Sequence, residues 1–104
     1  MIDTPQTLGI LVNSDKYFDY VLRLAQAASE RGKQVRVHVL DKGFGLFSAK
    51  EFSDLSRLAN VTACSAGMAS PAGEKPVLLP QTVAVVPPER LADILREFDR
   101  TVVF

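Results

Sequence analysis

Short apolar segments alternate with amphipathic segments along almost the whole chain, and this alternation restricts the possible folds more than any other feature. Residues 7–13 form a continuous apolar run, which is typical of a strand covered on both faces. Residues 17–31 follow with apolar side chains on one helical stripe and charged side chains on the opposite one. Gly32 then supplies the permissive backbone at a helix end. The first third of the chain therefore predicts a strand followed by a helix.

The same order recurs further along the chain. Ser48 and Glu51 form a capping-box signature ahead of a second helix, and Pro87-Pro88 is suited to begin a third. Five strands alternating with helices predict a three-layer α/β/α fold around a mostly parallel five-stranded sheet with right-handed crossovers. A chain of 104 residues fits one such domain, residues 1–104. The four later strands are expected at residues 34–40, 60–63, 82–86 and 101–104.

Composition excludes several classes of function. Twelve basic residues balance twelve acidic ones, so no basic field exists to hold nucleic acid. No stretch approaches the roughly 18 apolar residues of a membrane span, and the first residues do not resemble a signal peptide. We therefore expect a cytoplasmic protein that does not bind membranes or nucleic acids directly.

The single cysteine, Cys64, lies where the third expected strand ends and the small-residue turn Ser65-Ala66-Gly67 begins. In an open parallel sheet, chemistry gathers at the carboxyl ends of the strands, so a thiol there is a candidate reactive group. Free cysteine is also among the most buried residue types and often only fills space. Position and composition leave both interpretations open. One cysteine and one histidine provide neither a disulfide nor a zinc framework, which fits a reducing compartment.

Other candidate residues have simpler explanations. His38 alternates with valines in mid-strand, so we expect it to be exposed or interfacial, near a sheet edge, and not an acid or base. The glycines of residues 43–47 follow the second strand without the third glycine of a dinucleotide fingerprint, so they indicate an ordinary turn rather than a cofactor loop. The long connection over residues 65–80 suggests a lid, a short helix over residues 66–70, or an assembly surface.

The carboxyl ends of the strands are expected to share one rim. That rim would hold Ser14, Lys42, Cys64 and Ser65. A thiolate is favoured by a nearby cation or by the amino end of a helix. Lys42 is the candidate cation, and the backbone amides after Ser65 are the candidate helix end. These residues are the candidate site.

Two segments resemble the DsrE/DsrF-like sulfur-relay family, which includes TusD-like and TusC-like proteins. Residues 60–66, with the sequence NVTACSA, resemble the apolar third strand of the family with its cysteine and following small residues. Residues 95–104 resemble its closing helix and its aromatic-ended last strand. The resemblance covers nearly the whole chain and implies a DsrE-like fold.

The resemblance further implies that Cys64 carries a persulfide and passes sulfur between donor and acceptor proteins in sulfur metabolism or tRNA thiolation, without a metal or organic cofactor. It also implies homo-oligomers, or hetero-oligomers with related subunits, with residues 43–47 and 102–104 as apolar contact surfaces. Residues 66–71 carry no basic side chain, in contrast to many relay proteins. The alternative is therefore a non-catalytic assembly or ligand-binding module with an inert, buried cysteine.

Overall fold

The computed structural model describes residues 6–68 and 79–104. Its five strands form one sheet in the order β4-β3-β2-β1-β5, and every neighbouring pair is parallel. The predicted parallel five-stranded sheet is confirmed. The strands are β1 (Thr7–Val12), β2 (Gln34–Val39), β3 (Asn60–Cys64), β4 (Ala84–Val86) and β5 (Arg100–Val103).

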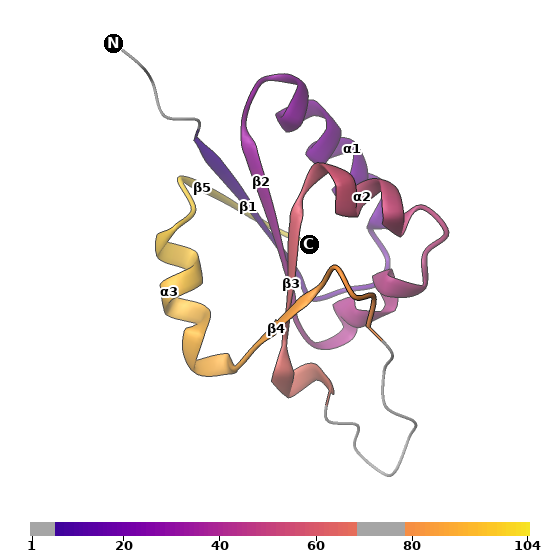
Figure 1. The fold of residues 1–104 in the computed structure, drawn as a ribbon, viewed down its shortest axis with the longest axis vertical. Helices are drawn as coiled ribbons and strands as arrows, with labels where there is room; N and C mark the ends of the chain where they lie inside the picture. The colour runs from indigo at the N-terminus through magenta and orange to yellow at the C-terminus, as the bar shows by residue number, and fades with distance from the viewer. Residues whose placement is uncertain (1–5, 69–78) are drawn as a thin grey trace.

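Helices flank the sheet on both faces, as the alternating pattern predicted (Figure 1). The helices α1 (Phe18–Glu30) and α2 (Phe52–Leu58) lie on one face, and α3 (Leu91–Arg96) lies on the other. Gly32 has a φ of 76° directly after α1, which confirms its predicted place at the helix end. Three 3₁₀ segments complete the described elements: η1 (Asp41–Ser48), η2 (Ser65–Met68) and η4 (Pro88–Arg90).

The main core lies between the sheet and the layer of α1 and α2. The three valines of β2 alternate toward this core, and α1 contributes the apolar stripe seen in the sequence. Each fully buried Val, Leu or Ile side chain contributes about 1.5–3 kcal/mol through burial. The most deeply buried members of this core are Ile10, Val21, Ala25, Val39, Leu55 and Ala63.

A single short helix anchors the second face of the sheet. Phe98, just after α3, packs so closely on β1 that a Cβ atom at Gly9 would overlap its ring. Glu97 forms an ion pair with Arg36 of β2, and the Arg36 guanidinium carbon lies 5.7 Å from the centre of the Phe98 ring. These contacts join the end of α3 to the interior strands β1 and β2.

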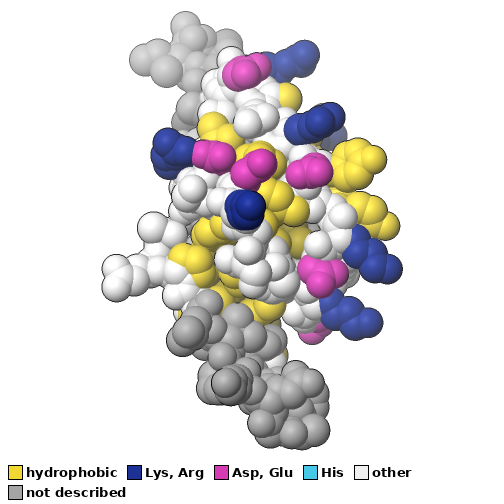
Figure 2. Space-filling view, turned by 90° about the vertical axis from the view of Figure 1, so that its right-hand side faces the viewer, with side chains coloured by type: hydrophobic (Ala, Val, Ile, Leu, Met, Phe, Trp, Pro, Cys, Tyr) yellow, Lys and Arg dark blue, Asp and Glu magenta, His cyan; other side chains and the backbone are white. Residues whose placement is uncertain are grey.

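The outer surface of the α1 and α2 layer mixes charges of both signs (Figure 2). Basic and acidic side chains are interspersed over this face, with apolar side chains visible between them. The face therefore carries no block of one sign. Within the two described ranges, no helix has the length and apolar character needed to cross a bilayer.

Three local predictions were wrong. Ser48 does not cap α2: it is the last residue of η1, and α2 begins four residues later without a side-chain cap. Residues 43–47 do not offer a broad apolar surface, because Phe44 and Leu46 are buried in the core. The fourth strand is shorter than expected and begins at Ala84. The expected helix over residues 66–70 lies partly outside the described residues. In the described part, η2 (Ser65–Met68) is a 3₁₀ segment.

Candidate functional site

Cys64 is the last residue of β3 and pairs in register with Val86 of β4. The turn η2 begins at the next residue, Ser65, so the thiol lies at the carboxyl rim of the sheet, as predicted. Alternation along β3 directs Val61 and Ala63 into the main core, and Cys64 toward the face that carries α3. The Cys64 side chain is buried, with 5% of its surface exposed.

His38 and Thr62 are the polar neighbours on this face. They are paired in register on β2 and β3, and His38 Nδ1 lies 2.7 Å from Thr62 Oγ1. The Thr62 hydroxyl is also 3.5 Å from the Val37 carbonyl, to which it can donate when His38 Nδ1–H donates to Thr62. Alternate residues of a strand are about 6.5 Å apart, so Cys64 lies one step along β3 from this pair.

The structure corrects the expectation for His38. Its side chain is 1% exposed, and β2 is an interior strand of the sheet rather than a strand near an edge. The polar residues that alternate with the valines of β2 lie on the face of the sheet that carries α3. At His38, this face is also packed and is not exposed to solvent. The His38–Thr62 pair could have been found from the register of β2 against β3. That register can be derived only when the strand order is known.

Burial lowers the pKa of His38 below its usual value of 6.5, and the nearby positive charge of Arg36 lowers the pKa further. The folded protein therefore holds a neutral imidazole at neutral pH, bonded to Thr62.

The stability of the protein should decrease as the pH falls below about 6.5. In this range the unfolded chain protonates His38 and the folded chain does not, so the unfolded state binds more protons. The free energy of unfolding should fall by up to about 1.4 kcal/mol per pH unit until the lowered folded pKa is reached. Urea unfolding between about pH 5.5 and 7 measures this slope, above the range in which most carboxylates titrate.

Two variants serve as controls for this slope. His38→Gln should flatten it, because the titrating group is gone. Thr62→Val should lower the free energy of unfolding at every pH but keep the slope, because the buried imidazole remains. An identical slope in the wild type and in His38→Gln would contradict the assignment of a neutral buried histidine.

The other predicted site residues lie on the same rim as Cys64. Ser14 follows β1, and its hydroxyl accepts a hydrogen bond from the Lys16 backbone N–H at 3.3 Å. Lys42 is exposed in the first turn of η1, a segment that packs against η2. Ser65 is half-buried as the first residue of η2. Within residues 6–68 and 79–104, no hydrogen bond or ion pair connects any of them to Cys64.

The arrangement limits the chemistry that the rim can perform. Among the described residues, no group of three His, Cys, Asp or Glu side chains is placed to hold a metal ion. The remaining reactive group is the thiol of Cys64, whose chemistry is nucleophilic exchange through its thiolate. Cys64 is 5% exposed, so its thiol can meet a partner only after the packing around it opens.

No family model matches this chain, and no curated protein matches its sequence. The resemblance to sulfur-relay proteins therefore depends on the sequence alone, mainly on residues 60–66 and 95–104, and stays a prediction.

Proposed function

We propose that the protein is a small sulfur-relay protein that carries a persulfide on Cys64 and passes sulfur between partner proteins in sulfur metabolism or tRNA thiolation. The observation that carries the proposal is the place of the lone cysteine. Cys64 ends a strand of a parallel sheet and directly precedes η2, at the rim where such folds bind and transform ligands. The segment around it, residues 60–66, is one of the two that resemble the sulfur-relay family.

The proposed transfer consists of two thiol–persulfide exchange steps, and in each of them one S–S bond forms and one S–S bond breaks. The Cys64 thiolate attacks the outer sulfur of a donor persulfide, a new S–S bond forms on Cys64, and the donor S–S bond breaks to release the donor thiolate. An acceptor thiolate then attacks the outer sulfur on Cys64 and restores its thiolate. No net oxidation or reduction occurs, so the cycle requires no metal or organic cofactor.

In this proposal the rim residues favour the thiolate once it is exposed. Lys42 provides positive charge from η1, which packs against the turn after Cys64. Ser65 and Ser14 provide hydroxyl groups on the same rim. The backbone N–H groups of η2 point toward its amino end, which follows Cys64 directly. Because Cys64 is buried, the rate of transfer should scale with the fraction of molecules in which the packing around Cys64 has opened.

Incubation with a persulfide donor tests the proposal. The wild-type protein should gain the mass of one sulfur atom, as measured by intact-protein mass spectrometry, and a low-molecular-weight thiol should remove it. Cys64→Ser should gain none. Lys42→Gln should slow the loading by about two- to fivefold, because a partly screened cation contributes about 1 kcal/mol or less to the exposed thiolate. No added sulfur on the wild type, or equal addition to Cys64→Ser, would refute sulfur carriage on this residue.

The burial of Cys64 favours a second candidate, a non-catalytic assembly or ligand-binding module in which the cysteine only fills space. The two candidates differ in how the thiol becomes accessible. A relay cysteine should react with a thiol reagent through local opening, at a rate that low urea concentrations barely change. A filler cysteine should react only through global unfolding, at a rate that rises with urea as steeply as the unfolding equilibrium.

A further inference from the structure

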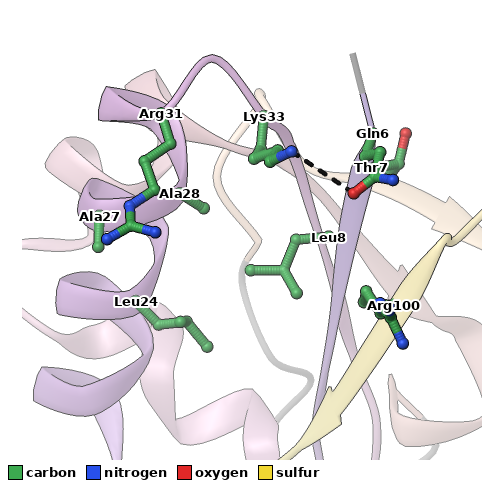
Figure 3. A pocket seen from close by; sticks show the side chains of 9 residues that line it. All are labelled: Gln6, Thr7, Leu8, Leu24, Ala27, Ala28, Arg31, Lys33 and Arg100. Carbon is green, nitrogen blue, oxygen red and sulfur yellow. Dashed lines mark hydrogen bonds between the residues drawn. The ribbon is translucent and has the colours of Figure 1, made fainter. Parts of the chain in front are cut away.

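A pocket of about 280 Å³ lies at the amino ends of β1 and β5, beside the last turns of α1 (Figure 3). Its walls are apolar: Leu8 projects from β1 toward Leu24 of α1, and Ala27 and Ala28 line the helix side. All strands of the sheet are parallel, so this pocket lies at the opposite rim from Cys64. It is therefore separate from the site proposed for sulfur transfer.

The strand order explains why the pocket is open. The helix α1 connects β1 to β2 and packs over these strands, whereas β5 is on the far side of β1. Among residues 6–68 and 79–104, no helix lies over the surface of β5 that faces the α1 layer (Figure 1). Leu8 and Leu24 are consequently only half-buried, and the small side chain of Ala27 leaves space between the helix and the strand.

Three cationic side chains lie at the margin of this apolar floor, two from the connection between α1 and β2 and one from β5. Arg31 follows α1, Lys33 precedes β2, and Arg100 begins β5. In the part of the chain that the structure describes, none of the three forms an ion pair: the ion pairs there use other arginines. Lys33 Nζ instead donates a hydrogen bond to Gln6 Oε1 at 3.4 Å (Figure 3).

The acidic residue next to Arg100, Asp99, is engaged in a hydrogen bond with the backbone. The Asp99 carboxylate accepts a hydrogen bond of 2.7 Å from the Thr7 backbone N–H, and Asp99 does not line the pocket. The pocket therefore combines an apolar floor with an excess of positive charge at its margin, in a protein whose formal net charge is zero.

We infer that this pocket binds a small organic carboxylate with an apolar chain. The chain would lie between Leu8 and Leu24, and the carboxylate would lie at the margin of the pocket, where Arg31, Lys33 and Arg100 provide positive charge on different sides of the apolar floor (Figure 3). A bare inorganic anion would leave the apolar floor unused, and a neutral apolar molecule would bring no negative charge to the three cations. Small-molecule pockets typically combine such an apolar lining with a few converging polar groups.

Titration with decanoate, below the concentration at which it forms micelles, tests the inference by isothermal calorimetry and by shifts of backbone amide resonances. Saturable binding is expected, with the largest shifts at the residues that line the pocket. Decanol should bind at least tenfold more weakly because it lacks the charge, and acetate should bind at least tenfold more weakly because it lacks the chain.

Two variants and one control locate the binding site. Ala27→Leu fills the floor from an exposed helical position and should weaken decanoate binding at least tenfold. Arg100→Gln removes one cation and should weaken binding about fivefold. Arg57→Gln removes a cation on α2, distant from the pocket, and should leave the affinity unchanged.

The possible results separate this pocket from the sulfur proposal. Binding without saturation, equal binding of decanol and decanoate, or an unchanged affinity in Ala27→Leu would overturn the inference. Cys64→Ser should bind decanoate as the wild type does. A failure of sulfur loading would leave decanoate binding intact, and a failure of decanoate binding would leave sulfur loading intact.

Discussion

Replacing Gly9 by alanine should destabilise the protein by about 3 kcal/mol, which is among the largest effects expected from adding one methyl group. A Cβ atom at this position would overlap Cδ2, Cγ and Cε2 of the Phe98 ring. The overlap includes the ring atom nearest the backbone, so a small rotation of the side chain cannot relieve it. Phe98 would have to leave β1, and the ring on which Arg36 packs would be lost with it.

A double-mutant cycle tests this cause. Phe98→Ala alone should cost about 3 kcal/mol through the lost burial of the ring. The double variant Gly9→Ala/Phe98→Ala should cost less than the sum of the two single changes by about 1–2 kcal/mol, because the overlap no longer exists. Thr101→Ala, at the exposed position paired with Gly9 on β5, should change the free energy of unfolding by only about 0.5 kcal/mol. Additive effects in the cycle, measured by urea unfolding, would show that Phe98 is not the cause.

Gly43→Ala should destabilise the protein by a comparable amount, also about 3 kcal/mol. Here the added Cβ would overlap the carbonyl oxygen of Val12 and lie 2.9 Å from its carbonyl carbon. That oxygen accepts a hydrogen bond of 2.8 Å from the Leu40 backbone N–H, so the backbone on both sides is fixed. The methyl group would therefore push η1 away from the carboxyl ends of β1 and β2.

Lys42→Ala, at the exposed position next to Gly43, is the control in the same 3₁₀ segment. Gly45 does not serve as a control, because a Cβ atom there would lie 2.5 Å from Cβ of Asp15, which rotation of the Asp15 side chain does not move. The expected cost of Lys42→Ala is below about 1 kcal/mol. Thermal and urea unfolding of Gly43→Ala and Lys42→Ala side by side measure the difference. Equal costs for both would mean that the Val12 carbonyl does not restrict position 43.

The sequence predicted the layers of the fold well because those layers follow from local periodicity. The valine alternation of β2 and the apolar stripe of α1 both face the core that they were expected to form. Local periodicity does not determine the order of the strands in the sheet. His38 looked exposed because its strand alternates, and it is buried because β2 lies inside the sheet with Thr62 beside it.

The candidate site could be predicted in position but not in its surroundings. Cys64 lies at the expected strand end, and Ser14, Lys42 and Ser65 lie on the expected rim. The exposure of the thiol depends on the tertiary packing around it, which buries Cys64, and no short motif encodes that packing. Ser48 shows the same limit: its capping signature was overridden by the buried side chains of η1, which place the start of α2 further along the chain.

The pairing of β5 with β1 has a consequence for the order in which the molecule assembles. The Thr7–Asp99 hydrogen bond joins residues 92 positions apart, so this contact closes a loop of nearly all the described chain. Such distant contacts form slowly, because the entropy lost on closing the loop precedes any gain from packing. We expect β5 to dock after β1, β2 and β3 have associated. The amides of β5 should then show lower protection against hydrogen exchange than those of β1, β2 and β3.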